Sequence, residues 1–132
     1  MVPPHRGVAR GEDPEVIHHE ENIQRALFAW LRIKHGAVAD QFIHVPNGGY
    51  RSKATAGRLK SAGVRRGVPD ILGFVPRQGF VGLAIELKAA GGRLSPQQAE
   101  WLDHLNSIGW LAVCCVGLDA AQETIASYLR EV

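Results

Sequence analysis

Hydrophobic positions recur along most of the chain with two spacings, one typical of helices and one typical of strands. Between residues 20 and 34, apolar side chains return mostly every three or four positions, with acids at the start and bases near the end, as the helix dipole favours. Similar patterns predict helices over 53–62, 95–109 and 119–132. Ser95 followed by Pro96 marks the start of the third of these four helices, and Asp119 is the expected N-cap of the last.

Short runs of aromatic and β-branched residues predict strands within 40–45, 70–76, 80–89 and 110–117. The second and third runs are separated by a short "RQG" turn, which predicts an antiparallel hairpin. The strand-helix-strand segment that follows requires a parallel pair, because its crossover spans a whole helix. The order α-β-α-β-β-α-β-α therefore predicts an α/β fold with a mixed central sheet flanked by helices.

The 132 residues are enough for one domain with a single core. Residues 1–14 are rich in Pro, Gly and charge and lack apolar periodicity, so we predict a flexible arm followed by one domain over 15–132. No apolar run approaches the ~20 residues that cross a bilayer, and the start lacks the apolar core of a secretory signal. We therefore expect a cytoplasmic protein in which Cys114 and Cys115 are free thiols on opposite faces of a strand.

Basic residues are concentrated in one segment, although the formal net charge is only +2. Residues 51–67 contain six Lys or Arg and no acid, which suits a polyanion, but a solvated basic surface has the same composition. The candidate phosphate contacts are Arg51, Lys53, Arg58, Lys60, Arg65 and Arg66. Asn47, followed by two glycines, either lets the backbone approach a phosphate or forms an ordinary turn.

Three charged residues interrupt the apolar strands of the predicted hairpin. Alternation places Glu86 and Lys88 on one face of their strand, ~7 Å apart, and Asp70 begins the neighbouring strand after Pro69. If the hairpin pairs across its turn, Asp70 and Glu86 lie near the same end. Two carboxylates and an ammonium group would then converge on one small volume.

Two acids brought together repel each other and should have raised pKa values unless a cation lies between them. Oxygen ligands without a Cys or His cluster suit Mg²⁺ or Mn²⁺, which take their remaining ligands from water and substrate phosphate. A lysine beside such a cation can hold the attacking water or stabilise charge on phosphorus, which favours phosphodiester hydrolysis. The alternative is an ordinary structural ion pair on the wet face of an amphipathic strand.

The spacing of these charges resembles the PD-(D/E)xK nuclease motif, with "PD" at Pro69 and Asp70 and "ELK" at Glu86 to Lys88. The other segments that match lie on either side of it: "EENIQ", "PNGG", "AGRLKSAGVRRGVPD", "LSPQQ" and "GWLAVC". In this order they resemble the VRR-NUC family, the virus-type replication-repair nucleases. The resemblance covers about residues 20 to 129.

The resemblance implies a PD-(D/E)xK core and a DNA endonuclease that depends on Mg²⁺ or Mn²⁺. Small members are similar to Holliday-junction resolvases, so it implies a four-way or otherwise branched DNA substrate, a homodimer, and a role in replication or repair in a bacterial or phage-infected cell. The residues that match the family's catalytic positions are Glu20, Asp70, Glu86, Lys88 and Gln98, with Asp70, Glu86 and Glu20 as metal ligands.

Two of these assignments choose between adjacent residues of the same type. Glu20 is preferred to Glu21 because it shares a helix face with Gln24, and Gln98 is preferred to Gln97 by its spacing to Trp101. The alternative function is a nucleic-acid-binding module that uses the basic segment 51–67 without catalysis.

Overall fold

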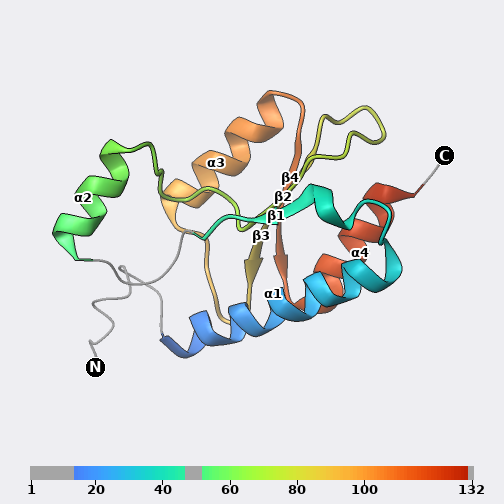
Figure 1. The fold of residues 1–132 in the computed structure, drawn as a ribbon, viewed down its shortest axis with the longest axis horizontal. Helices are drawn as coiled ribbons and strands as arrows, with labels where there is room; N and C mark the ends of the chain where they lie inside the picture. Colours follow the sequence, from blue (N-terminus) through green and yellow to red (C-terminus); the bar gives the residue numbers. More distant parts are fainter. Residues whose placement is uncertain (1–13, 47–51, 131–132) are drawn as a thin grey trace.

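The computed structural model describes residues 14–46 and 52–130 and shows an α/β fold (Figure 1). Its elements are α1 (Pro14–Lys34), the 3₁₀-helix η2 (Ala39–Gln41), β1 (Phe42–His44), α2 (Lys53–Ser61), β2 (Ile71–Gly73), β3 (Leu83–Lys88), α3 (Pro96–Ser107), β4 (Leu111–Val116) and α4 (Leu118–Leu129). The predicted order of helices and strands is confirmed, with η2 as an addition. None of the helices in the described ranges has the length and apolar content needed to cross a membrane.

The four strands form one sheet in the order β1-β2-β3-β4. β2 pairs antiparallel with both β1 and β3, whereas β3 and β4 are parallel. The predicted hairpin and the predicted parallel crossover are therefore confirmed. A bridge between Arg77 and Phe80 closes the turn of the hairpin, and Ile71 lies opposite Ile85 at its other end.

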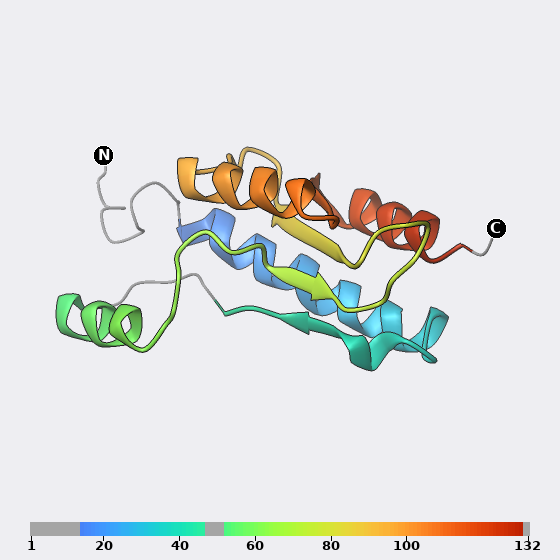
Figure 2. The same ribbon diagram turned by 90° about the horizontal axis from the view of Figure 1, so that it is seen from above.

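Helices cover both faces of the sheet, with α3 on one side and α1 and α4 on the other (Figures 1 and 2). Strand alternation explains this division, because Leu83, Ile85 and Leu87 of β3 belong to the core with α1 and α4, and Ala84 belongs to the smaller core under α3. All six residues of β3 are buried. The central strand therefore carries Glu86 and Lys88 into the interior of the protein.

Several element boundaries differ from the predictions, including those of β2 and β3, which are shorter than the predicted strands. α1 begins at Pro14, six residues early, because proline is well tolerated in a first helical turn; the rest of the predicted arm lies outside the described residues. The first predicted strand is shorter, since residues 39–41 form η2. The N-cap of α4 is Gly117 with φ 95°, whereas Asp119 lies in the first turn, where its charge still favours the helix dipole.

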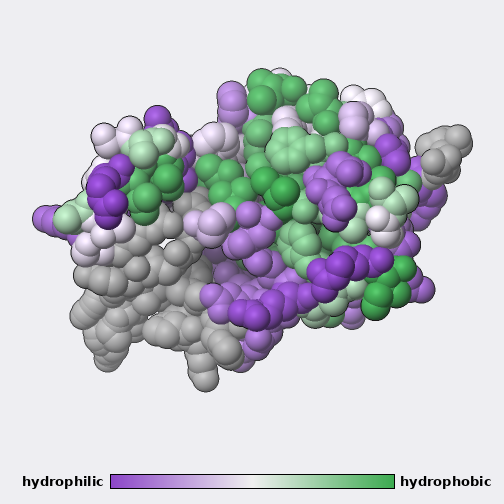
Figure 3. All heavy atoms as spheres, in the orientation of Figure 1, coloured by the Kyte–Doolittle hydropathy of each residue, from purple (hydrophilic) through white to green (hydrophobic). Residues whose placement is uncertain are grey.

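α2 projects from the domain, away from the sheet (Figures 1 and 2). Ser52 caps its start by accepting a hydrogen bond from the Thr55 amide, and none of its residues is buried. In the view of Figure 3, hydrophilic side chains lie along α1, whereas apolar side chains gather over α3 and its neighbouring strands. The predicted basic helix is thus exposed and projects from the core. We call α2, together with the exposed Arg65 and Arg66 that follow it, the basic arm.

A first prediction concerns close packing between β1 and β2. A Cβ atom added at Gly73 would overlap the buried Phe42 ring, so Gly73→Ala should cost about 1–3 kcal/mol of stability through overpacking. Gly57 in α2 is the control, because a Cβ there meets nothing within 4 Å and alanine favours the helix. Denaturant unfolding of both variants measures the difference. Equal midpoints would contradict the described packing.

Candidate functional site

Asp70 lies next to Glu86 at one end of the β2–β3 hairpin. Ile71 pairs with Ile85, so Asp70, one residue before β2, comes opposite Glu86 in the same register. The Leu87 amide donates a hydrogen bond of 2.7 Å to Oδ2 of Asp70. The backbone of β3 therefore fixes the Asp70 carboxyl beside the strand that carries the second acid.

Glu86 and Lys88 point to the same side of β3 and are 2% and 1% exposed. Nζ of Lys88 lies 3.8 Å from Oε2 of Glu86. Because both side chains are buried, they are not an ordinary ion pair on a solvent-exposed face of the strand. Burial also makes any unbalanced charge energetically costly.

Gln98 connects helix α3 to the acid cluster. Its Nε2 donates a hydrogen bond of 3.0 Å to Oε2 of Glu86, while its Oε1 accepts one of 2.8 Å from the Ser95 amide. The Ser95 hydroxyl in turn accepts from the Gln98 amide, which completes a capping box. The helix cap therefore orients the glutamine that holds the Glu86 carboxyl.

Glu20 approaches the cluster from α1. A Cβ atom added at Gly92 would come within 3.1 Å of both Oε2 of Glu20 and Cδ of Lys88, so Gly92 leaves room for these two side chains. The charge of Glu20 also contributes to the raised pKa of Glu86. The predicted residues Asp70, Glu86, Lys88 and Gln98 thus meet at one end of the sheet, and Glu20 lies beside Lys88.

Burial shapes the protonation of the two neighbouring acids. Burial, followed by the charge of Asp70 and its hydrogen bond, raises the pKa of Glu86 from its ordinary 4.5 to about 10, against the opposing effect of Lys88. Burial also raises the pKa of Asp70, although the Leu87 amide and the hydrogen bond with Glu86 oppose the rise. In the absence of a cation, the pair therefore retains a proton at neutral pH.

The donor set fits a hard divalent cation. Oε1 of Glu86 is buried and has no hydrogen-bond partner among the described residues, and Asp70 supplies a second carboxyl beside it. In the part of the chain whose side chains are described, no three His, Cys, Asp or Glu are gathered closely enough to form a metal cluster. Two carboxylates nevertheless suit Mg²⁺ or Mn²⁺, since these ions keep several water ligands.

The structure distinguishes between the doubled residues. Glu20 is half-buried beside the cluster, whereas Glu21 is exposed, and Gln98 contacts Glu86, whereas Gln97 is exposed. Asn47 and Arg51 lie outside the described residues. The remaining predicted phosphate contacts are exposed on or after α2: Lys53, Arg58, Lys60, Arg65 and Arg66.

Sequence reasoning missed His44 and the partner of Trp101. Nδ1 of His44 donates a hydrogen bond of 2.9 Å to the Asp70 carbonyl oxygen, and Nε1 of Trp101 donates one of 3.1 Å to the Arg66 carbonyl oxygen. The first bond joins β1 to Asp70 and the second joins α3 to Arg66, so the segment 66–70 is held at both ends. Alternation from the buried Phe42 could have indicated the face of His44, but no local pattern indicates either partner.

The fold and the cluster together define the class of protein. A mixed sheet whose central hairpin carries Pro-Asp and Glu-x-Lys at one end has the arrangement of a PD-(D/E)xK nuclease domain. The model of the VRR-NUC domain matches residues 18–118. The chain therefore belongs to the VRR-NUC family of nuclease domains.

A solved structure supports the same assignment. A VRR-NUC domain protein is 27% identical, with a TM-score of 0.73, and the match covers 83% of this chain and 87% of that one. No curated protein matches the sequence. The resemblance inferred from the ordered motifs is thus confirmed for the family and the fold.

A second prediction follows from the raised pKa of Glu86. Between pH 4.5 and about 10, the unfolded chain has lost this proton while the folded one retains it, so folding takes up a proton. In EDTA, the free energy of unfolding should therefore fall as the pH rises from 6 to 9, by up to about 1.4 kcal/mol per unit for this one group. Denaturant unfolding at several pH values measures the slope.

Glu86→Gln should flatten this pH dependence, because the amide retains the hydrogen bond from Gln98 but does not titrate. Glu100→Gln, at an exposed position of α3, is the matched control and should leave the slope unchanged. An identical slope in the wild type and the Glu86 variant would show that Glu86 is ionised throughout.

Proposed function

We propose that this chain is a metal-dependent DNA endonuclease that hydrolyses phosphodiester bonds at the acid cluster. One observation carries the proposal: in a member of the VRR-NUC family, the buried Glu86 and Lys88 meet the half-buried Asp70 at one end of the β2–β3 hairpin. Burying an acid and an ammonium group beside a second, half-buried acid is unfavourable for folding alone. Such an arrangement is typical of a site whose chemistry needs those charges.

Asp70 and Glu86 would hold Mg²⁺ or Mn²⁺, with Glu20 as a further acid beside Lys88. When bound, this cation supplies positive charge to the phosphoryl oxygens and lowers the pKa of water. Gln98 holds Oε2 of Glu86 by a hydrogen bond, so Oε1, which has no partner among the described residues, would be available to the cation. Lys88 extends into the same volume, where its ammonium group can orient the attacking water and stabilise charge that develops on the phosphate.

The basic arm would place the DNA backbone on the domain without reading its sequence. Lys53, Arg58 and Lys60 of α2 are exposed and free of core packing, and Arg65 and Arg66 follow in the exposed segment that leads to Asp70. A non-catalytic binding module would use the same arm. It would have no need for Glu86 and Lys88 in the core, which favours the enzyme.

The finer substrate assignment is supported by the family resemblance. We propose a branched DNA substrate, with a four-way junction as the leading candidate, and a homodimer as the active form. A symmetric dimer would present two acid clusters to two strands of one junction, which suits paired incisions.

A third prediction separates catalysis from binding. Lys88→Met retains the buried aliphatic stem but removes the ammonium group, so single-turnover cleavage should fall at least 100-fold while DNA affinity in Ca²⁺ changes little. The control is the double variant Arg65→Ala with Arg66→Ala, which should weaken binding and reduce its salt dependence. Equal losses of affinity in both variants, with normal cleavage once DNA is bound, would make Lys88 a phosphate contact.

A fourth prediction concerns the cation. Cleavage should require Mg²⁺ or Mn²⁺, cease in EDTA, and be inhibited by Ca²⁺, whose coordination is longer and looser. Asp70→Asn should lower the cleavage rate at least 100-fold, because a neutral amide is a poor ligand for these ions. The asparagine oxygen can still accept the hydrogen bond from the Leu87 amide. Asp103→Asn, exposed on α3, is the control for loss of one carboxylate. Strong cleavage in excess chelator would refute the mechanism.

A further inference from the structure

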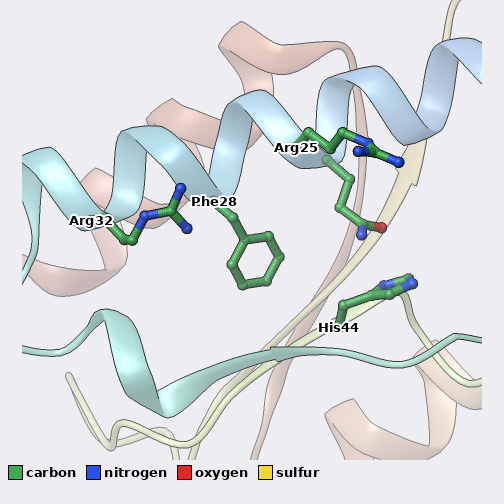
Figure 4. Close-up of a pocket in the computed structure, with 5 residues that line it drawn as sticks. Arg25, Phe28, Arg32 and His44 are labelled. Carbon is green, nitrogen blue, oxygen red and sulfur yellow. The ribbon is translucent and has the colours of Figure 1, made fainter.

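A pocket of about 320 Å³ lies between α1 and β1, apart from the basic arm (Figure 4). We call it the α1–β1 pocket; it is lined by Gln24, Arg25, Phe28, Arg32 and His44. Figure 4 shows the Phe28 ring extending from α1 toward β1, with the Arg32 guanidinium turned toward it and the His44 ring rising from β1. None of the five lining residues is acidic, so the pocket favours an anionic ligand that carries a flat apolar group.

The pocket is joined to the acid cluster through two elements. Glu20, Gln24 and Phe28 are spaced four apart and share one face of α1, so a single stripe leads from the cluster into the pocket. On the other side, His44 donates its Nδ1–H to the carbonyl oxygen of Asp70. A chain-like ligand could therefore occupy the acid cluster and the pocket together.

We propose that the α1–β1 pocket binds one nucleotide that is unpaired and unstacked at the branch point of the substrate DNA. The inference deepens the proposed function, on which its choice of DNA rests. Its volume of about 320 Å³ is at the small end of ligand sites and matches a single nucleotide. An aromatic side chain between cations is the usual platform for an unstacked base, because every base has a π-face.

Some lining residues contact the base of the nucleotide and others contact its phosphate backbone. Phe28 stacks against the base, and it is fixed because part of its ring packs on the main core. Arg25 and Arg32 are seven residues apart, about 10 Å along the helix, so they contact the phosphates on either side of that nucleotide. Since Nδ1 of His44 is engaged by the Asp70 carbonyl, Nε2 is the nitrogen that meets the ligand.

Binding in Ca²⁺ tests the pocket without cleavage. The probes are a short fluorescent oligothymidine and a blunt, fully paired duplex, and the variants are Phe28→Leu and the pair Arg25→Gln with Arg32→Gln. Phe28→Leu should weaken oligothymidine binding about fivefold or more through lost stacking. The arginine pair should reduce the slope of log affinity against log salt by about 0.7 per contact on the same probe. Duplex binding should change less than twofold in either variant.

Arg130→Gln, at the C-cap of α4 and outside the pocket, is the control for loss of one exposed arginine. Because Phe28 touches the core, thermal unfolding of its variant is measured as well; the arginine variant, with two exposed sites, keeps the test decisive if Phe28→Leu unfolds. Equal losses on duplex and single strand, or no loss on either, would overturn the proposal.

The two proposals can fail separately. Wild-type protein that cleaves DNA in Mg²⁺, with pocket variants that bind oligothymidine normally, would refute the pocket and leave the nuclease intact. Protein that fails to cleave in Mg²⁺ or Mn²⁺ but shows the expected selective loss of single-strand binding would refute the nuclease and support the pocket.

Discussion

The burial of the Glu86 carboxyl and the Lys88 ammonium group beside the half-buried carboxyl of Asp70 is the constraint on which the rest of this structure depends. Asp70 and Glu86 lie opposite each other at the end of the β2–β3 hairpin, in a sheet covered by helices on both faces. Their charges cannot both be retained in such an environment without a counter-charge, and Lys88 supplies only one. A proton satisfies the pair in the absence of metal, and a divalent cation would satisfy it during function.

Several structural details follow from holding this pair in place. The Leu87 amide fixes Asp70, the α3 capping box fixes Gln98 against Glu86, and Gly92 leaves space for Glu20 and Lys88. The parts that would meet DNA lie outside this rigid centre, on the projecting α2 and in the α1–β1 pocket. A buried chemical site with peripheral backbone contacts would suit the enzyme proposed above, which would recognise the shape of DNA more than its sequence.

Sequence reasoning predicted the hairpin and the shared face of Glu86 and Lys88 from turn chemistry and local alternation, and the parallel crossover from the helix between its two strands. It could not establish that this face is buried, since Glu-x-Lys in a strand is also common on a wet surface, and only the packing of α3 decides between them. The same limit explains His44 and the α1–β1 pocket. The pocket depends on how α1 lies beside β1, and the bond of His44 depends on how β1 pairs with β2; no periodic pattern in the sequence records either.

The central claim is that Asp70 and Glu86 share a divalent cation, and anomalous diffraction from Mn²⁺-soaked crystals tests it most directly. Carboxylates bind this ion through oxygen, so the account predicts a peak within bonding distance of both side chains and its loss in Asp70→Asn crystals. Crystals of protein shown to cleave DNA in Mn²⁺ that carry no peak at these carboxyls, or a peak that persists in Asp70→Asn, would contradict it.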